Sequence, residues 1–159
     1  MKKLLFLAML AICCATTVAN AQMGGKAKVA VYVSGEIDDV YKRIVNSKAT
    51  AYISRSSKYV ALERGDVFLD ALMKEQDYQL SGEVRADQIV EVAARHGARY
   101  VAAFDVNMTP DGFCLMTARL INVETGVIIK SIDSNRTVNS TEDLVGLTNN
   151  VAYRLFVQS

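Results

Sequence analysis

Residues 99–135 read RYVAAFDVNMTPDGFCLMTARLINVETGVIIKSIDSN, and this stretch sets the architecture of the chain. It contains three runs rich in apolar residues, at 99–108, 113–124 and 127–135, separated by two short joints. The first joint, TPDG, places proline and glycine as a turn requires, and the second, ETG, is a tight hairpin loop. Two short loops in succession predict a three-stranded antiparallel meander.

The middle run is largely apolar on both of its alternating sides. One side carries Phe113, Leu115, Ile121 and Val123, and the other carries Cys114, Met116, Ala118 and Leu120. A strand that is apolar on both sides is expected to be covered on both. We therefore expect helices on both faces of the sheet.

Strands are also expected upstream, at 27–33 (AKVAVYV) and at 59–63 (YVALE). Between them, from Glu36 onward, apolar residues recur with the period of an amphipathic helix. These residues are Ile37, Val40, Tyr41, Ile44 and Val45. On the solvent side we expect an ion pair between Asp39 and Arg43, which are four residues apart.

Three further helices are expected. One begins near Asp66 and stops at Gly82, and the next runs from Ala86 to His96 with Gly97 as its stop. The latter should bury Ile89, Val90, Ala93 and Ala94. The last begins with a capping box of Ser140 and Asp143 and buries Leu144, Leu147, Val151 and Leu155. The pattern predicts an α/β (α+β) domain at 27–159, with a mixed sheet of about five strands, a C-terminal antiparallel meander and helices on both faces.

The first 21 residues have the pattern of a signal peptide: two lysines, an apolar run, and then Ala19-Asn20-Ala21. We expect cleavage before Gln22, followed by a flexible lead at 22–26. A lipoprotein signal is the rival reading, but Cys13 and Cys14 lack a small residue before them, so we do not expect a lipid anchor. Residues 22–159 offer no apolar stretch of the length that a membrane helix needs, so no direct span is expected.

Removal of the leader takes two of the 18 basic residues and none of the 17 acidic ones, so the mature charge is 16 minus 17, or minus one. Such a balance gives no general attraction for nucleic acid, and no nucleic-acid partner is expected. Cys114 is the single cysteine that remains, which excludes an internal disulfide.

Few residues favour catalysis. His96 is the lone histidine, and with Cys114 it falls short of the three or four ligands that zinc requires. The acidic residues fall mostly at expected helix starts, where carboxylates stabilise the helix.

Asp105 is in the middle of a strand, and we expect it to form an ion pair with Arg119 or Lys130. The loop SRSSK, 54–58, has two cations but lacks the glycines of a phosphate-binding loop. We expect no enzyme activity, cofactor or metal.

An ordered set of short motifs resembles a known superfamily. The set comprises Leu62-Glu63-Arg64, Leu69, Leu72, Glu75-Gln76, Ser81-Gly82-Glu83-Val84, Ala93, Gly97-Ala98, Tyr100-Val101 and the hairpin Ile121-Asn122-Val123-Glu124-Thr125-Gly126-Val127. It is similar to the soluble domain shared by curli-secretion channel lipoproteins and the outer-membrane lipoprotein activators of penicillin-binding proteins. The resemblance spans about Val29 to Phe156.

The resemblance implies a role in envelope assembly or regulation that works through protein contacts, without catalysis. It departs from the curli channel, because the loops TPDG and ETG are too short to span a membrane. Arg85 also stands where these proteins often place an acidic or polar helix cap.

The function predicted is that of a non-enzymatic exported bacterial envelope protein, periplasmic or associated with the outer membrane. Its partner would be another envelope protein or a second copy of itself. Glu75, Tyr78 and Gln79 are the predicted contact residues, since tyrosine beside polar groups suits interfaces. Two alternatives stay open: a ring-forming secretion subunit, and a small periplasmic enzyme with an unrecognised carboxylate site.

Overall fold

The computed structural model of the chain describes residues 25–62 and 86–158. Within these ranges the chain forms β1 (Ala27–Ser34), α2 (Asp39–Arg55), β2 (Tyr59–Ala61), α4 (Ala86–Arg95), β3 (Tyr100–Met108), β4 (Phe113–Asn122), β5 (Ile128–Thr137) and α5 (Thr141–Phe156). The helix predicted between Asp66 and Gly82 lies outside the described residues. The same is true of the signal peptide, so the division of the chain at Gln22 stays a prediction.

The strands form one mixed sheet in the order β2-β1-β3-β4-β5. The strand β1 runs parallel to both β2 and β3, whereas β3, β4 and β5 are successively antiparallel. The predicted meander is therefore confirmed, and so is the mixed sheet of about five strands. A bulge near Leu120 and Ile121 interrupts the β4–β5 register.

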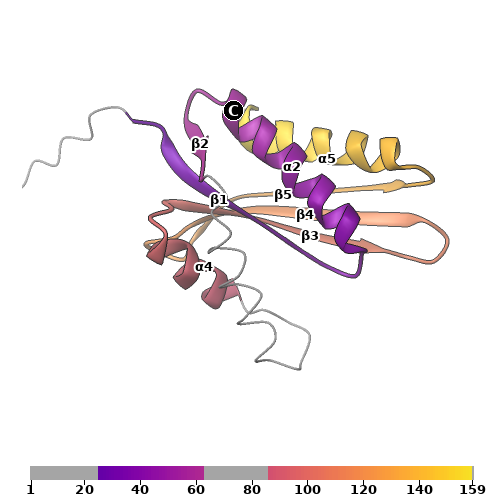
Figure 1. The fold of residues 1–159 in the computed structure, drawn as a ribbon, viewed down its shortest axis with the longest axis horizontal. Helices are drawn as coiled ribbons and strands as arrows, with labels where there is room; N and C mark the ends of the chain where they lie inside the picture. The colour runs from indigo at the N-terminus through magenta and orange to yellow at the C-terminus, as the bar shows by residue number, and fades with distance from the viewer. Residues whose placement is uncertain (1–24, 63–85, 159) are drawn as a thin grey trace, which may run out of the picture.

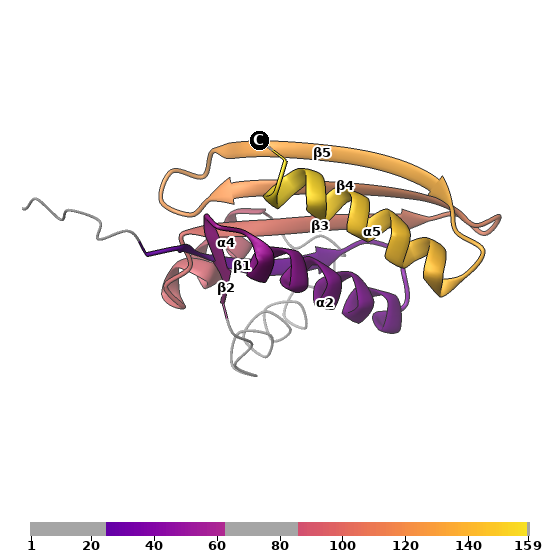
Figure 2. The same ribbon diagram turned by 90° about the horizontal axis from the view of Figure 1, so that it is seen from above.

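Helices lie on both faces of the sheet, as predicted. Figures 1 and 2 show α2 and α5 side by side on one face, and Figure 1 shows α4 on the opposite face. The larger core lies under α2 and α5 and includes Phe104, Met116 and Leu120. A smaller core under α4 includes Ala30, Val101 and Ile121.

The helix α2 begins three residues later than the predicted start at Glu36, and its buried side differs from the predicted stripe. Its buried residues are Val45, Asn46, Ala49 and Ile53. Val40 was predicted to be buried but is 57% exposed. The reason is that α2 packs against both the sheet and α5, so the buried stripe lies on the side that meets both of them.

The prediction for α4 is right in its extent and in part wrong in its buried face. The helix ends at Arg95, and Gly97 has a φ of 74°, the left-handed conformation expected of a helix stop. Ile89 and Ala93 are buried as predicted, but Val92 takes the third buried position and Ala94 is exposed. Burial at 89, 92 and 93 follows the spacing of a helix that contacts the sheet along one narrow line.

The expectation that β4 is covered on both sides holds fully on one side and in part on the other. Cys114, Met116, Ala118 and Leu120 are all buried under α2 and α5. On the other side Ile121 is buried next to α4, but Phe113 and Leu115 are 43% and 41% exposed. Among the described elements, α4 alone lies on that face, and its apolar contacts are with one end of the sheet.

The last helix, α5, closes the larger core. Its capping box is formed as predicted, with Asp143 N–H donating to Ser140 Oγ at 3.2 Å and Ser140 N–H donating to Asp143 Oδ2 at 3.1 Å. The predicted residues Leu144, Leu147, Val151 and Leu155 are buried. The buried hydroxyl of Thr148 donates to the Leu144 carbonyl at 2.8 Å, so its polar group is satisfied within the helix.

Candidate interaction surface

The contact residues predicted from the sequence, Glu75, Tyr78 and Gln79, lie outside the described residues. Their role stays a prediction. Asp39, Asp105, Cys114 and His96 lie within the described residues, and each has a definite place in the fold.

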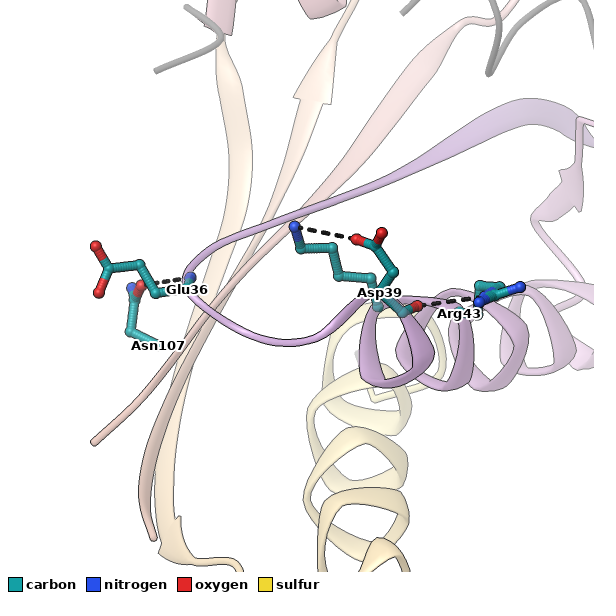
Figure 3. A network of polar contacts seen from close by, with 5 residues as sticks. Glu36, Asp39, Arg43 and Asn107 are labelled. Atoms are coloured by element: carbon teal, nitrogen blue, oxygen red, sulfur yellow. Dashed lines mark hydrogen bonds and ion pairs between the residues drawn. The ribbon is translucent and has the colours of Figure 1, made fainter. Parts of the chain in front are cut away.

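Asp105 belongs to a hydrogen-bond network at the end of β1. Its carboxylate accepts a hydrogen bond from Ser34 Oγ at 3.4 Å and another from Asn107 Nδ2 at 3.3 Å. Asn107 Oδ1 in turn accepts from the backbone N–H of Glu36 at 3.4 Å, a contact that Figure 3 shows. The network ties the loop after β1 to β3, so these polar groups have a structural role.

The predicted ion pair of Asp105 with Arg119 or Lys130 is wrong. Arg119 lies opposite Ala103 and Lys130 lies opposite Leu120, whereas Asp105 lies opposite Thr117. The Lys130 ammonium donates instead to the Gln158 carbonyl oxygen. The register of the strands therefore places these three charges at different points of the sheet.

The predicted ion pair between Asp39 and Arg43 is also wrong in its partner. Arg43 Nε donates to the backbone carbonyl oxygen of Asp39 at 3.4 Å, as Figure 3 shows. The Asp39 carboxylate lies 3.6 Å from Lys42 Nζ instead. Both arrangements are at the exposed start of α2, where ion pairs contribute little to stability.

Cys114 and His96 have different surroundings. Cys114 is fully buried in the larger core, as predicted, and this burial raises the pKa of its thiol. A thiol in this state behaves as a small apolar group.

His96 is half-buried just past the end of α4, and its backbone N–H closes the last turn by donating to the carbonyl oxygens of Val92 and Ala93. Within the described ranges, no cluster of three or more histidine, cysteine or acidic residues is placed to hold a metal ion.

The predicted loop at 54–58 is helical at Ser54 and Arg55, which end α2, and the loop proper begins at Ser56. This loop joins three parts of the fold. Ser56 is buried, and its hydroxyl donates to the Phe156 carbonyl oxygen at the end of α5 at 3.4 Å. Its own carbonyl accepts from Lys26 Nζ at 2.8 Å, and its Oγ accepts from the Lys58 N–H at 3.2 Å. These contacts give the loop a structural role in holding α2, α5 and β1 together.

Seven of the nine large apolar side chains that are exposed within the described residues fall in two groups, and the other two are Val40 and Val60. The first group, which we call the open sheet face, consists of Phe113 and Leu115 with the polar residues beside them on β3 and β5. Leu115 lies between Asn107 and Asn135, and Phe113 lies opposite Thr137. This part of the sheet combines apolar centres with amide and hydroxyl neighbours, a composition found at protein interfaces.

The second group lies where the start of β5 meets the end of α5, and we call it the β5 corner. It consists of Val127, Ile128, Ile129, Tyr153 and Val157, which are between 43% and 59% exposed. Two hydrogen bonds hold these elements together: Arg154 Nη1 donates to the Asp133 carbonyl oxygen at 3.3 Å, and Lys130 donates to Gln158. Ile128 lies opposite Ile121 and therefore on the α4 face of the sheet, whereas Tyr153 and Val157 lie at the end of α5, so the β5 corner includes residues from both faces. Several exposed apolar side chains at one edge favour a binding surface.

Sequence reasoning missed both groups for an identifiable reason. The apolar residues of β4 predict cover on both sides, and the sequence does not show that α4 is confined to one end of the sheet. The run Val127-Ile128-Ile129 is the one visible signal for the β5 corner, because three consecutive apolar residues cannot all point into a core from a strand.

This arrangement of strands and helices is the fold of a class of proteins that includes bacterial envelope lipoproteins. The chain is similar to PelC from Paraburkholderia phytofirmans, solved as a dodecamer, with 17% identity, a TM-score of 0.55, and coverage of 85% of this chain and 90% of that one. The chain is also similar to lipoprotein GNA1162 from Neisseria meningitidis, with 17% identity, a TM-score of 0.55, and coverage of 84% of this chain and 98% of that one.

The C-terminal domain of LpoB from Salmonella enterica is also similar, with 17% identity, a TM-score of 0.50, and coverage of 73% of this chain and 87% of that domain. LpoB is one of the penicillin-binding protein activators that the sequence resembles, so the resemblance is confirmed at the level of the fold. No model of a protein family matches the sequence, and no curated protein sequence matches it either.

Proposed function

We propose that this chain is a non-enzymatic exported protein of the bacterial cell envelope that acts by binding other proteins. Its task would be in envelope assembly, in secretion, or in the regulation of cell-wall synthesis. The observation that carries the proposal is the exposure of large apolar side chains in two groups, the open sheet face and the β5 corner. The likeness in fold to LpoB, GNA1162 and PelC supports it.

The places of the potentially reactive groups favour binding over catalysis. Cys114 is part of the core, Asp105 holds the loop after β1, and Ser56 joins α2 to α5. Each of these side chains is engaged in the fold, whereas the large apolar side chains named above are exposed to solvent. Surfaces of that kind mark sites of protein association.

The proposed location is the periplasm, either free or in association with the outer membrane, after cleavage before Gln22. None of the helices within the described residues has both the length and the apolar character needed to cross a bilayer. The leader pattern of residues 1–21 supports export.

Chemical crosslinking in intact cells tests the proposal. A tagged copy of the full chain, treated with an amine-reactive crosslinker, should be recovered joined to a small set of envelope proteins, which mass spectrometry identifies. The same experiment on cells that express an unrelated exported protein with the same tag is the control. Recovery of the chain as an uncrosslinked monomer, together with turnover of a substrate by the purified protein, would contradict the proposal.

A ring-forming role is the second candidate function. The likeness to PelC, which was solved as a dodecamer, is the observation that favours it. Light scattering of the purified mature protein at micromolar concentration decides between the two. A particle of many subunits would support the ring, and a monomer would favour binding to a different protein.

A further inference from the structure

The outer edge of β5 has its own hydrogen-bonding pattern. Among the strands of the described residues, β5 is last in the sheet order and pairs with β4 alone. Just beyond it, the Val138 N–H donates to the Gly112 carbonyl oxygen at 2.8 Å. Because the groups of successive residues alternate in an antiparallel pair, the even-numbered residues after the bulge, from Lys130 to Arg136, direct their N–H and C=O groups to β4. The odd-numbered residues Ser131, Asp133 and Asn135 direct theirs outward.

The contact made by Arg154 agrees with this alternation. Its guanidinium, which comes from α5, donates to the carbonyl oxygen of Asp133, an odd-numbered residue. A side chain thus satisfies one acceptor of the outer edge from the side of the sheet on which α5 lies. An edge that carries outward backbone groups is able to accept another strand.

The start of the same edge is unusually apolar. Val127, Ile128 and Ile129 follow one another and are 59%, 50% and 51% exposed. Proteins generally protect sheet edges with charged residues, proline or short strands, and consecutive exposed apolar residues at an edge are avoided unless they have a function. The apolar start and the outward backbone groups together describe a site for an added strand, which is a known mode of peptide recognition.

The charges of β5 do not favour antiparallel pairing of this edge with the same edge of a second copy. Lys130 and Arg136 lie opposite Leu120 and Cys114, on the face that α5 covers, whereas Asp133 lies opposite Thr117 on the other face. When two strands pair antiparallel in one continuous sheet, facing residues lie on the same face. No register of β5 with itself therefore sets Asp133 against either cation.

The face that α5 covers carries three cations near this edge: Lys130 and Arg136 from β5 and Arg154 from α5. Asp143 lies close enough to Arg136 for their charges to interact, and its carboxylate accepts the capping hydrogen bonds of α5. A strand added here would be stabilised by acidic side chains that point toward α5.

We propose that the edge of β5 binds an extended segment of a partner protein as a sixth strand. The segment places apolar residues beside Val127, Ile128 and Ile129, and it carries acidic residues at positions an even number of residues apart, facing Lys130, Arg136 and Arg154. This inference rests on the proposed function and deepens it by naming the chemistry of the partner and the way in which it binds.

Photocrosslinking from the full chain in cells tests this inference. A photoreactive amino acid is placed at Asn135, beside the outer edge, and in a second variant at Ser47, which is exposed on α2. Crosslinks from Asn135 should join an extended acidic and apolar segment of another protein. Ser131→Pro removes an outward N–H and keeps the hydrogen bonds between β5 and β4. It should therefore lower the yield of crosslinks from Asn135 about tenfold. Ser131→Ala keeps the N–H and should leave the yield unchanged.

A charge reversal gives a second readout that does not depend on how the sheet accepts proline. Arg136→Glu should also lower the yield from Asn135 about tenfold, whereas Arg43→Glu on α2 should not. The melting temperature of each variant is measured as the control for a retained fold.

Four outcomes would overturn the inference. The first is an equal crosslinking yield from the Ser131→Pro and Ser131→Ala variants. The second is crosslinking from Asn135 to a second copy of the chain. Crosslinks from Ser47 alone would overturn it and leave the proposed function standing. The absence of any partner, both here and with the amine-reactive crosslinker, would remove the inference and the proposed function together.

Discussion

Gly35 sits where the backbone of β1 leaves the sheet and passes close to β3. Its φ is 113°, and a Cβ at this position would lie 1.9 Å from the backbone oxygen of Val106. Gly35→Ala should therefore destabilise the protein by about 3 kcal/mol, because neither the conformation nor the space accepts a methyl group. Urea denaturation measures the change.

Gly97→Ala is the matched control, because Gly97 also has a positive φ but a Cβ there would meet nothing within 4 Å. It should cost about 1 to 2 kcal/mol from the backbone conformation alone. Equal losses in the two variants would show that the close approach to Val106 is not present.

Cys114 gives a pH dependence whose sign follows from burial. Burial raises the pKa of its thiol in the folded state, so the unfolded chain loses the proton at a lower pH than the folded one. The free energy of unfolding should be unaffected by this group below the ordinary thiol pKa of about 8.5 and should fall above it, by at most about 1.4 kcal/mol per pH unit. Urea denaturation between pH 7 and 10 measures this fall.

The comparison for this pH series is Cys114→Ala, which removes the thiol. The difference in unfolding free energy between wild type and variant should shrink as the pH rises. A difference that is constant across the series would mean that the thiol ionises equally well in the folded protein.

At the scale of elements, α5 depends on its capping box. The Asp143 pKa is lowered by the hydrogen bond that its carboxylate accepts from the Asn139 backbone and by that from the Ser140 side chain. Its contribution to stability is therefore present at neutral pH and lost as the pH falls through the lowered pKa. Asp143→Asn should remove this part of the acid sensitivity, which acid titration followed by circular dichroism would show.

Ser140→Ala removes the hydroxyl that accepts from the Asp143 N–H, and it should cost about 1 kcal/mol. Ser140→Thr keeps a hydroxyl and should cost less. If both variants unfold at the wild-type denaturant concentration, the cap contributes nothing to α5.

The elements differ in how well the sequence predicts them, and local chemistry explains the difference. The meander and the cap of α5 are predicted correctly because turns and caps depend on a few adjacent residues, such as Thr109-Pro110-Asp111-Gly112 and Ser140 with Asp143. The buried stripe of α2 was predicted less well, since it is set by contacts with α5, about a hundred residues away.

The candidate surfaces were beyond sequence reasoning for the same reason. An apolar residue such as Leu115 or Ile128 has the same local pattern whether a helix covers it or not. Its exposure depends on where α4 lies across the sheet and on which strand forms the edge. The predicted contacts Glu75, Tyr78 and Gln79 stay a prediction.

For the molecule as a whole, one face of the sheet is covered by two helices and the other in part by α4. Cys114, Asp105 and Ser56 are built into this framework. By contrast, Phe113 and Leu115 of β4 and Ile128 and Ile129 of β5 are exposed. This arrangement supports the proposal that the protein acts by binding other proteins.

Complementation of a deletion strain by two sets of variants tests this conclusion most directly, with resistance of the cell envelope to detergent as the readout. Phe113→Ser with Leu115→Ser, and Ile128→Ser with Ile129→Ser, change exposed apolar residues, and at least one of these pairs should fail to complement while being present at wild-type levels. Asp105→Asn, His96→Gln and Cys114→Ala change the potentially reactive groups, and all three should complement. Loss of function in a variant of the second set that folds normally, with full function in both surface pairs, would contradict the conclusion.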